Sequence, residues 1–164
     1  NEEGLKWFIS KIWPKVKNAN PNLELHIIGN WLESQKKPYS QDYSIIFEGF
    51  VEDLTKAFDG AITIVPILSG SGIRMKILDC VNYGSPFVST TVGALGMGFN
   101  DGKDCFIADT PEDFASKIIT LIKDKNLFAN FYVKSYEVYK SLYSSEALAL
   151  KRLNIYIDIL KNKF

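Results

Sequence analysis

The chain has 164 residues, of which 46% are hydrophobic and 13% aromatic, so it is long and apolar enough to form a core and is not intrinsically disordered. Lysine plus arginine and aspartate plus glutamate both number 19, and this zero net charge argues against bulk electrostatic binding of nucleic acid or anionic membrane. It does not exclude a local cationic pocket. No segment is apolar enough to predict a membrane span, and no signal peptide is visible.

Few residues carry reactive side chains. The two cysteines, Cys80 and Cys105, have no metal-ligand spacing and do not make a disulfide framework, which favours a reducing compartment. The single histidine, His26, falls in an expected strand without a serine or cysteine motif, so we interpret it as a packed or rim histidine rather than a catalytic base.

The N-terminal part of the chain predicts a helix followed by two strands. Apolar residues recur at helical spacing over residues 4–18, where Pro14 should kink the helix or begin a new first turn. Strands are expected at 23–29 and 43–51. The polar stretch 31–42 between them should form a loop with a short helix.

The middle of the chain combines short apolar runs with turns rich in glycine. A short helix should begin at Glu52–Asp53, with acidic residues in its first turn, and end near Gly60. The apolar run 61–67 is typical of a strand buried on both faces, and residues 73–83 predict the next helix.

The remaining chain predicts two strands and three helices. Gly84–Pro86 should stop the preceding helix, and the run Gly93–Gly98 is not a dinucleotide fingerprint because its order is wrong. Thr110, Pro111 and the acids after them are a strong helix start. The expected elements are a strand at 87–90, a loop at 91–103, a strand at 104–109, and helices at 110–123, 126–141 and 144–161, the last with Leu148, Leu153, Tyr156, Ile157 and Leu160 on its apolar side.

This alternation of strands and helices predicts an α/β fold with a mostly parallel sheet. In such sheets, ligands bind at the carboxyl ends of the strands, near the point where the strand order reverses. The stretch 70–79 and the loop 91–103 both follow strands directly. We therefore expect these two segments to contribute to a binding site.

The turn between the strand at 61–67 and the next helix has the composition of a phosphate site. Gly70 and Gly72 allow a ligand to approach the backbone closely. A strand-to-helix turn gathers unpaired N–H groups at the positive end of the helix dipole, and Arg74 and Lys76 add positive charge.

The helix that follows should have two faces. One stripe is expected to pack on the sheet (Ile73, Ile77, Cys80 and Val81). Lys76, Asp79 and Tyr83 lie on another side, so that a cation for phosphate and a carboxylate for sugar hydroxyls would project together. The same spacing also fits a solvated ion pair between Lys76 and Asp79, which leaves both interpretations open.

Seven motifs occur along the chain in a recognisable order and spacing: Trp7–Pro14, Leu25–Gly29, Phe47–Val51, Val65–Ile67, Gly70–Asp79, Gly84–Thr90 and Val92–Gly96. In this order the chain resembles a known family, the C-terminal domain of GT-B glycosyltransferases of the group 1 or family 4 type. The resemblance covers nearly the whole chain and implies a Rossmann-like three-layer sandwich that forms the C-terminal half of a GT-B fold.

The resemblance implies a donor-binding half of a retaining glycosyltransferase that uses a UDP- or GDP-sugar without a metal or other cofactor. Gly70, Ser71, Gly72, Arg74 and Lys76 would then hold the donor diphosphate. The catalytic base would belong to an N-terminal acceptor-binding domain, so no catalytic residue is assigned in this half. The implied partners are the nucleotide sugar, that N-terminal domain and a glycan or lipid-linked acceptor.

Three further groups of residues acquire roles from the resemblance. Asp79 stands where the family usually has a glutamate that binds the ribose. Gly49, Phe50 and Val51 would lie along the base. The loop would close near the phosphates and the sugar (Gly93, Ala94, Leu95 and Gly96).

The chain departs from the family at two places. The family's paired glutamates are separated by seven residues, and here Ser71 and Asp79 occupy their positions, so the contacts to the donor sugar are open. The family's domain also opens with a strand, whereas this chain starts at Asn1 and runs into the following helix. We therefore expect residues 1–164 to be one domain of a longer protein, inactive alone, whose sheet is completed by a strand from the intact chain.

Two other classes compete with the glycosyltransferase hypothesis. A non-catalytic α/β nucleotide-binding or interaction module is favoured by Ser71 at the first glutamate position. A receiver-like flavodoxin fold would need an acidic cluster at the strand ends, which the sequence lacks. A cytoplasmic protein, with a peripheral position at the inner membrane face, is expected from the family. The sequence leaves open the sugar, the base, the acceptor, the linkage and the oligomeric state.

Overall fold

The first expected helix is built from three helical pieces in the computed structural model, which describes residues 2–161. They are α1 (Glu2–Trp7), the π-helical turn η1 (Phe8–Ile12) and α2 (Trp13–Ala19). Pro14 lies in the first turn of α2, where its missing N–H is not needed, and the wider π turn ahead of it accommodates the ring. The expectation of a new first turn at Pro14 is confirmed.

Every described strand pairing is parallel, as the alternating pattern predicts. β1 (Leu25–Ile28) pairs with β2 (Ile45–Gly49). β3 (Thr63–Val65), β4 (Phe87–Ser89) and β5 (Phe106–Ile107) form a second sheet in the order β3-β4-β5. The described strands therefore form two separate parallel sheets, one of β1 and β2 and the other of β3, β4 and β5.

The helices occupy the expected segments, with small changes at their ends. The short ones are α3 (Glu33–Lys36), the 3₁₀ turn η2 (Lys37–Tyr39), α4 (Leu54–Phe58) and α6 (Thr91–Ala94). The longer ones are α5 (Met75–Asn82), α7 (Pro111–Lys123), α8 (Lys125–Tyr143) and α9 (Ser145–Lys161). Asp53 is the N-cap of α4, accepting from the Thr55 N–H, rather than a member of its first turn.

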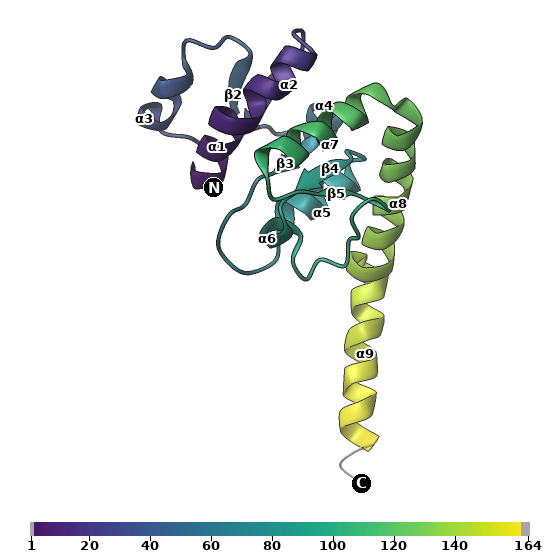
Figure 1. Ribbon diagram of the computed structural model, residues 1–164. Coiled ribbons are helices and arrows are strands. Elements are labelled where there is room, and N and C mark those ends of the chain that lie inside the picture. Colours follow the sequence, from purple (N-terminus) through teal and green to yellow (C-terminus); the bar gives the residue numbers. More distant parts are fainter. Residues whose placement is uncertain (1, 162–164) are drawn as a thin grey trace.

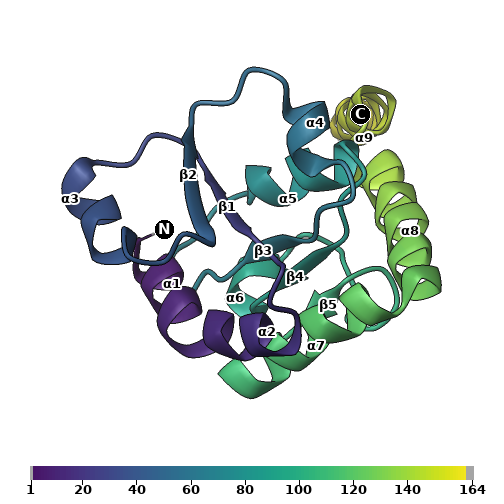
Figure 2. The same ribbon diagram turned by 90° about the horizontal axis from the view of Figure 1, so that it is seen from above.

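Helices cover both sides of the strands, which gives the expected three layers. α2 and α7 lie on one side and α5 on the other (Figure 2). One apolar cluster joins η1 and α2 to β1 and α7, and a second joins β3 and β4 to α5. Both cysteines are buried in the second cluster, and neither forms a disulfide. Burial raises the pKa of the Cys80 thiol to about 12.

Two expectations about helices are wrong. Ile73 does not join the packed stripe of α5, because that helix begins two residues later and Ile73 is 67% exposed. The segment 91–103, expected to be all loop, begins with the single turn α6 because the Thr90 hydroxyl caps it by accepting the Gly93 N–H.

The last helix stands away from the two sheets (Figure 1). Its predicted apolar side, which includes Leu148, Tyr156 and Leu160, is exposed, with fractions from 37% at Ile157 to 60% at Leu160. Ser144 caps α9 by accepting the Ala147 N–H. Within residues 2–161, no helix is both long enough and apolar enough to cross a bilayer.

Candidate functional site

Two segments converge at one edge of the second sheet, because β3 and β4 are parallel neighbours and their carboxyl ends point the same way. Residues 66–74 follow β3, and residues 90–98 follow β4. Hydrogen bonds join the segments directly: the Thr90 hydroxyl donates to the Ile67 carbonyl, and the Ser89 hydroxyl lies 3.3 Å from the Val65 carbonyl oxygen. The two stretches that sequence analysis singled out therefore lie side by side.

The α6 loop, defined here as Gly93–Gly96, is packed closely against the end of β3 at its start. A Cβ on Gly93 would lie 2.9 Å from the Val65 carbonyl oxygen and 2.3 Å from the Ser89 hydroxyl, so only glycine fits. Gly93 and Ala94 are buried, whereas Leu95 is 73% exposed. The loop thus has a fixed beginning and an exposed tip at Leu95 and Gly96.

The exit of the α6 loop is anchored as well. The Met97 side chain is 2% exposed within the second apolar cluster. Its carbonyl accepts a hydrogen bond of 3.1 Å from the hydroxyl of Tyr143, on α8. Leu95 and Gly96 therefore lie between two anchored ends.

The glycine turn, defined here as Gly70–Gly72, is exposed and has left-handed backbone at both glycines, with φ of 111° at Gly70 and 94° at Gly72. Arg74 folds back onto this turn. Its Nη1 donates to the Ser71 carbonyl at 2.8 Å and its Nη2 to the Gly70 carbonyl at 3.0 Å. The guanidinium that sequence analysis assigned to an anion thus bonds the turn's own backbone in this structure.

Lys76 and Asp79 are partly buried on α5, beside the glycine turn. Burial, helped by the nearby positive charge of Arg74, lowers the pKa of the Lys76 ammonium. Burial raises the pKa of the Asp79 carboxyl. Tyr83, which sequence analysis placed on the same side, stacks on Phe58 with ring centroids 5.8 Å apart.

The expected base-adjacent residues belong to the other sheet. Gly49 ends β2 with a φ of 71°, and its carbonyl accepts the Gly29 N–H at 2.7 Å. Phe50 follows and is 79% exposed. His26 lies on the rim of the same sheet, as expected, with Nδ1 2.6 Å from a Glu48 oxygen.

A hollow of about 650 Å³ lies elsewhere, at the junction of α8 and α9, and none of the predicted site residues lines it. Its lining combines charged residues of both helices, such as Lys140 and Lys151, with apolar residues of α9, such as Leu150 and Ile155. Among residues 2–161, no group of three or more histidine, cysteine, aspartate or glutamate side chains could hold a metal ion.

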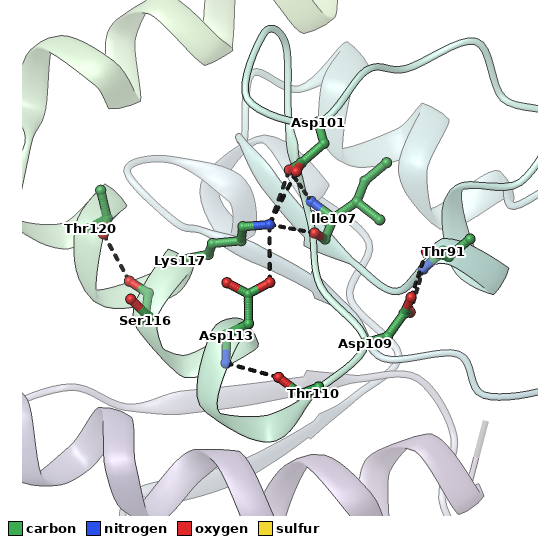
Figure 3. Close-up of polar contacts among 9 residues, drawn as sticks. All are labelled: Thr91, Asp101, Ile107, Asp109, Thr110, Asp113, Ser116, Lys117 and Thr120. Atoms are coloured by element: carbon green, nitrogen blue, oxygen red, sulfur yellow. Dashed lines mark hydrogen bonds and ion pairs between the residues drawn. The ribbon is translucent and has the colours of Figure 1, made fainter.

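Sequence analysis missed a polar junction beside the α6 loop (Figure 3). Asp109 accepts both the N–H and the hydroxyl of Thr91, at 2.8 and 2.6 Å. Lys117, with a side chain 18% exposed, bonds carboxylates of Asp101 and Asp113 at 3.1 and 3.2 Å. Asp113 and Lys117 are four residues apart on α7, a helical spacing that sequence analysis could have used. The other two partnerships, Thr91 with Asp109 and Asp101 with Lys117, join residues 18 and 16 positions apart, so local spacing gave no signal for them.

The sequence matches a family model described as Glycosyl transferases group 1, over residues 1–124. A curated relative from Klebsiella pneumoniae, an uncharacterized 44.6 kDa protein in the cps region, is 35% identical over 133 residues. That match covers 76% of this chain but 34% of the relative. The chain therefore spans about a third of the curated relative that it matches.

Solved structures share the fold at low sequence identity. The C-terminal domain of a Glycosyl Transferase Group 1 family protein (LpcC) from Francisella tularensis has a TM-score of 0.68 and 17% identity, over 85% of this chain and 82% of that one. HepE from Anabaena, solved in complex with UDP and glucose, has a TM-score of 0.73 and 14% identity, over 88% of this chain and 43% of that one. This likeness confirms the expected fold, that of the C-terminal half of a GT-B protein.

Proposed function

The chain belongs to the family described as Glycosyl transferases group 1, and from this premise we propose that it is the donor-binding part of a glycosyltransferase. The whole protein would transfer a sugar, with retention, from a nucleoside-diphosphate sugar to an acceptor. One observation carries the proposal. The glycine turn and the α6 loop follow the carboxyl ends of neighbouring parallel strands, where α/β sheets bind ligands, and Lys76 lies on the helix after the turn.

In this proposal the glycine turn and Lys76 bind the diphosphate. Turn glycines allow the phosphates to approach the backbone, and a partly buried ammonium interacts more strongly with an anion than an exposed one. Lys76 would stabilise the charge that builds on the leaving diphosphate during transfer. Arg74 contributes to the same site in one of two ways. Its positive charge attracts the diphosphate, or its hydrogen bonds to the Gly70 and Ser71 carbonyls hold the turn in shape.

The remaining assignments follow the family resemblance. Asp79 would accept hydrogen bonds from the ribose, and Gly49–Val51 would border the base. The α6 loop would close on the phosphates and the sugar. UDP or GDP are the proposed nucleotides, and the UDP complex of HepE supports the choice of UDP as the first probe. We assign no metal to the reaction.

The acceptor and the cellular role are also proposals. The Klebsiella pneumoniae relative is described as encoded in a cps region, which supports a role in polysaccharide biosynthesis on a glycan or lipid-linked acceptor. A second, N-terminal domain would bind that acceptor and supply the catalytic base. We propose a cytoplasmic protein that works at the inner face of the membrane.

Calorimetric titration with UDP, GDP and UDP-sugars tests the donor site. We expect Lys76→Ala to weaken binding of the diphosphate about 10- to 100-fold, the range for a lost hydrogen bond to a charged group. Lys151→Ala, at an exposed lysine of α9, is the matched control and should bind like the wild type. A folded wild type that binds none of these nucleotides would contradict the proposal.

Ser71 favours the second candidate, a non-catalytic nucleotide-binding or interaction module, because it replaces the carboxylate that the family has there. A nucleotide-binding module differs from the enzyme only in turnover, whereas an interaction module also differs in that it binds no nucleotide. Hydrolysis or transfer of a UDP-sugar by the whole protein would select the enzyme, whereas tight binding without turnover over a panel of acceptors would select the module.

A further inference from the structure

Helix α6 is too short to fix its own geometry. It has four residues, a single turn, and an isolated turn of helix is unstable because its first hydrogen bond does not offset the entropy of ordering it. Its orientation must therefore come from contacts with neighbouring elements. Since the α6 loop begins inside this turn, those contacts also set where Leu95 and Gly96 lie.

Asp109 provides one such contact, from a different strand connection (Figure 3). One carboxylate oxygen accepts the Thr91 N–H at 2.8 Å and the other accepts the Thr91 hydroxyl at 2.6 Å. Both bonds are charge-assisted, and together they fix the direction as well as the position of the first residue of α6. On the side of this turn that faces β3, Thr90 bonds the Ile67 carbonyl and Gly93 packs against the Val65 carbonyl.

The backbone that carries Asp109 is itself held in place. The preceding residue, Ala108, donates its N–H to the Ser89 carbonyl at 2.8 Å, which continues the pairing of β5 with β4. The next residue, Thr110, caps α7 by accepting the Asp113 N–H at 3.3 Å. Lys117 then bonds Asp113 and the Ile107 carbonyl, so that β5 and α7 are joined on both sides of Asp109.

We propose that Asp109 is a positioning residue for the α6 loop, one that orients its tip toward the phosphates and sugar of the donor by holding Thr91. The inference rests on the proposed donor site. It adds to that site a residue that belongs neither to the glycine turn nor to the α6 loop. Asp109 acts through Thr91 and does not touch the donor.

Asp109→Ala, compared with the wild type, tests the proposal through ligand discrimination. We expect the variant to bind UDP-sugar about five- to twentyfold more weakly than the wild type does, but UMP less than twofold more weakly. UMP lacks the second phosphate and the donor sugar, which are the groups that the loop tip would contact. Asp109→Asn should restore most of the affinity, since its amide can accept the Thr91 N–H and donate to the Thr91 oxygen.

Asp124→Ala is the matched control. Like Asp109, Asp124 accepts hydrogen bonds at the start of a helix: it is the N-cap of α8 and accepts the N–H groups of Asn126 and Leu127 at 3.0 and 2.9 Å, but it lies outside the loop region. This variant should lose stability without changing the ratio of UDP-sugar affinity to UMP affinity. A shift of that ratio in Asp124→Ala as large as in Asp109→Ala would show a general effect of instability and overturn the proposal.

Hydrogen exchange of the amides of residues 92–96 gives a readout that needs no ligand. Faster exchange in Asp109→Ala than in Asp109→Asn and the wild type is expected, and equal exchange in all three overturns the proposal. A wild type that binds nucleotides, together with an unchanged affinity ratio in Asp109→Ala, defeats the positioning role alone. A wild type that binds no nucleotide defeats the donor site itself and the positioning role with it.

Discussion

The glycine turn and the α6 loop leave neighbouring strands at the same edge of one sheet, yet they are held in different ways. The α6 loop is fixed by other elements, through Thr90, Asp109 and the close packing of Gly93. The tip of the glycine turn is bonded by its own Arg74. A loop anchored by other elements keeps its two ends in place whether or not a ligand is present, whereas a turn bonded by a neighbouring side chain can exchange those bonds for bonds to a ligand.

The largest expected effect is on the packed beginning of the α6 loop. Gly93→Ala would place a methyl group 2.9 Å from a backbone oxygen that cannot move away, and we expect a loss of about 3 kcal/mol in the free energy of unfolding. Gly96→Ala, in the same loop, meets nothing within 4 Å, and its positive φ of 73° should cost about 1 kcal/mol. Urea denaturation measures both, and equal losses would show that the packing at Gly93 is loose.

Thr90 joins the two segments, so its substitution should affect both. Its side chain is 2% exposed, donates to the Ile67 carbonyl and accepts the Gly93 N–H at 3.0 Å. Thr90→Val keeps the shape but leaves two buried backbone groups unpaired, which should cost about 2 kcal/mol. Thr90→Ser keeps the hydroxyl and is the control. If denaturation finds the two variants equally stable, the hydroxyl does not join the segments.

The features of these two segments that the sequence predicted are those held by residues close together in the chain. The glycine turn, the strand before it and the cap at Thr110 were predicted because each depends on residues within a few positions of one another. The start of α5 at Met75 was not, since Arg74 is drawn back to the turn by a side-chain bond that hydrophobic spacing does not report. The role of Asp109 was missed because its partner lies 18 residues earlier.

The apolar residues of α9 show a second limit of prediction from local sequence. The sequence correctly predicted a helix there. The predicted apolar side is not a separate face, because Leu150, Ile155 and Ile159, which lie outside it, are exposed apolar residues of the same helix. Periodicity indicates that a face is apolar, but it does not say what covers that face. In residues 2–161 those side chains are exposed, because no described element packs over them.

Substitution of Arg74 tests whether its hydrogen bonds to the carbonyls of the glycine turn matter for ligand binding. Because its guanidinium reaches two carbonyls at once, a lysine cannot replace it, although lysine keeps the charge. We expect both Arg74→Ala and Arg74→Lys to weaken UDP binding about fivefold and to lower the free energy of unfolding by about 1 kcal/mol, because the half-buried guanidinium bonds two backbone carbonyls. Calorimetry that finds full affinity in Arg74→Lys would show that Arg74 acts by its charge.

The last expected effect, which is confined to high pH, is the pH dependence of nucleotide affinity that Lys76 confers. Since burial lowers the pKa of its ammonium, Lys76 should lose its proton at a lower pH than an exposed lysine does. UDP affinity should therefore fall as the pH rises through that lowered pKa, by no more than about tenfold per pH unit, the limit for one proton. Lys76→Arg should abolish the fall, and titrations above about pH 7.5, where the phosphates are already ionised, would measure it.

Stability should change in the opposite direction over the same range. A lysine whose pKa is lower in the folded than in the unfolded protein disfavours folding while it is charged in both states. That cost is removed as the pH rises from the folded pKa to the unfolded one, so the contribution of Lys76 to the free energy of unfolding should increase there. Denaturation curves of wild type and Lys76→Met across this range isolate the contribution. If affinity and stability fall together, the loss of affinity comes from unfolding, and Lys76 is not the group that binds the diphosphate.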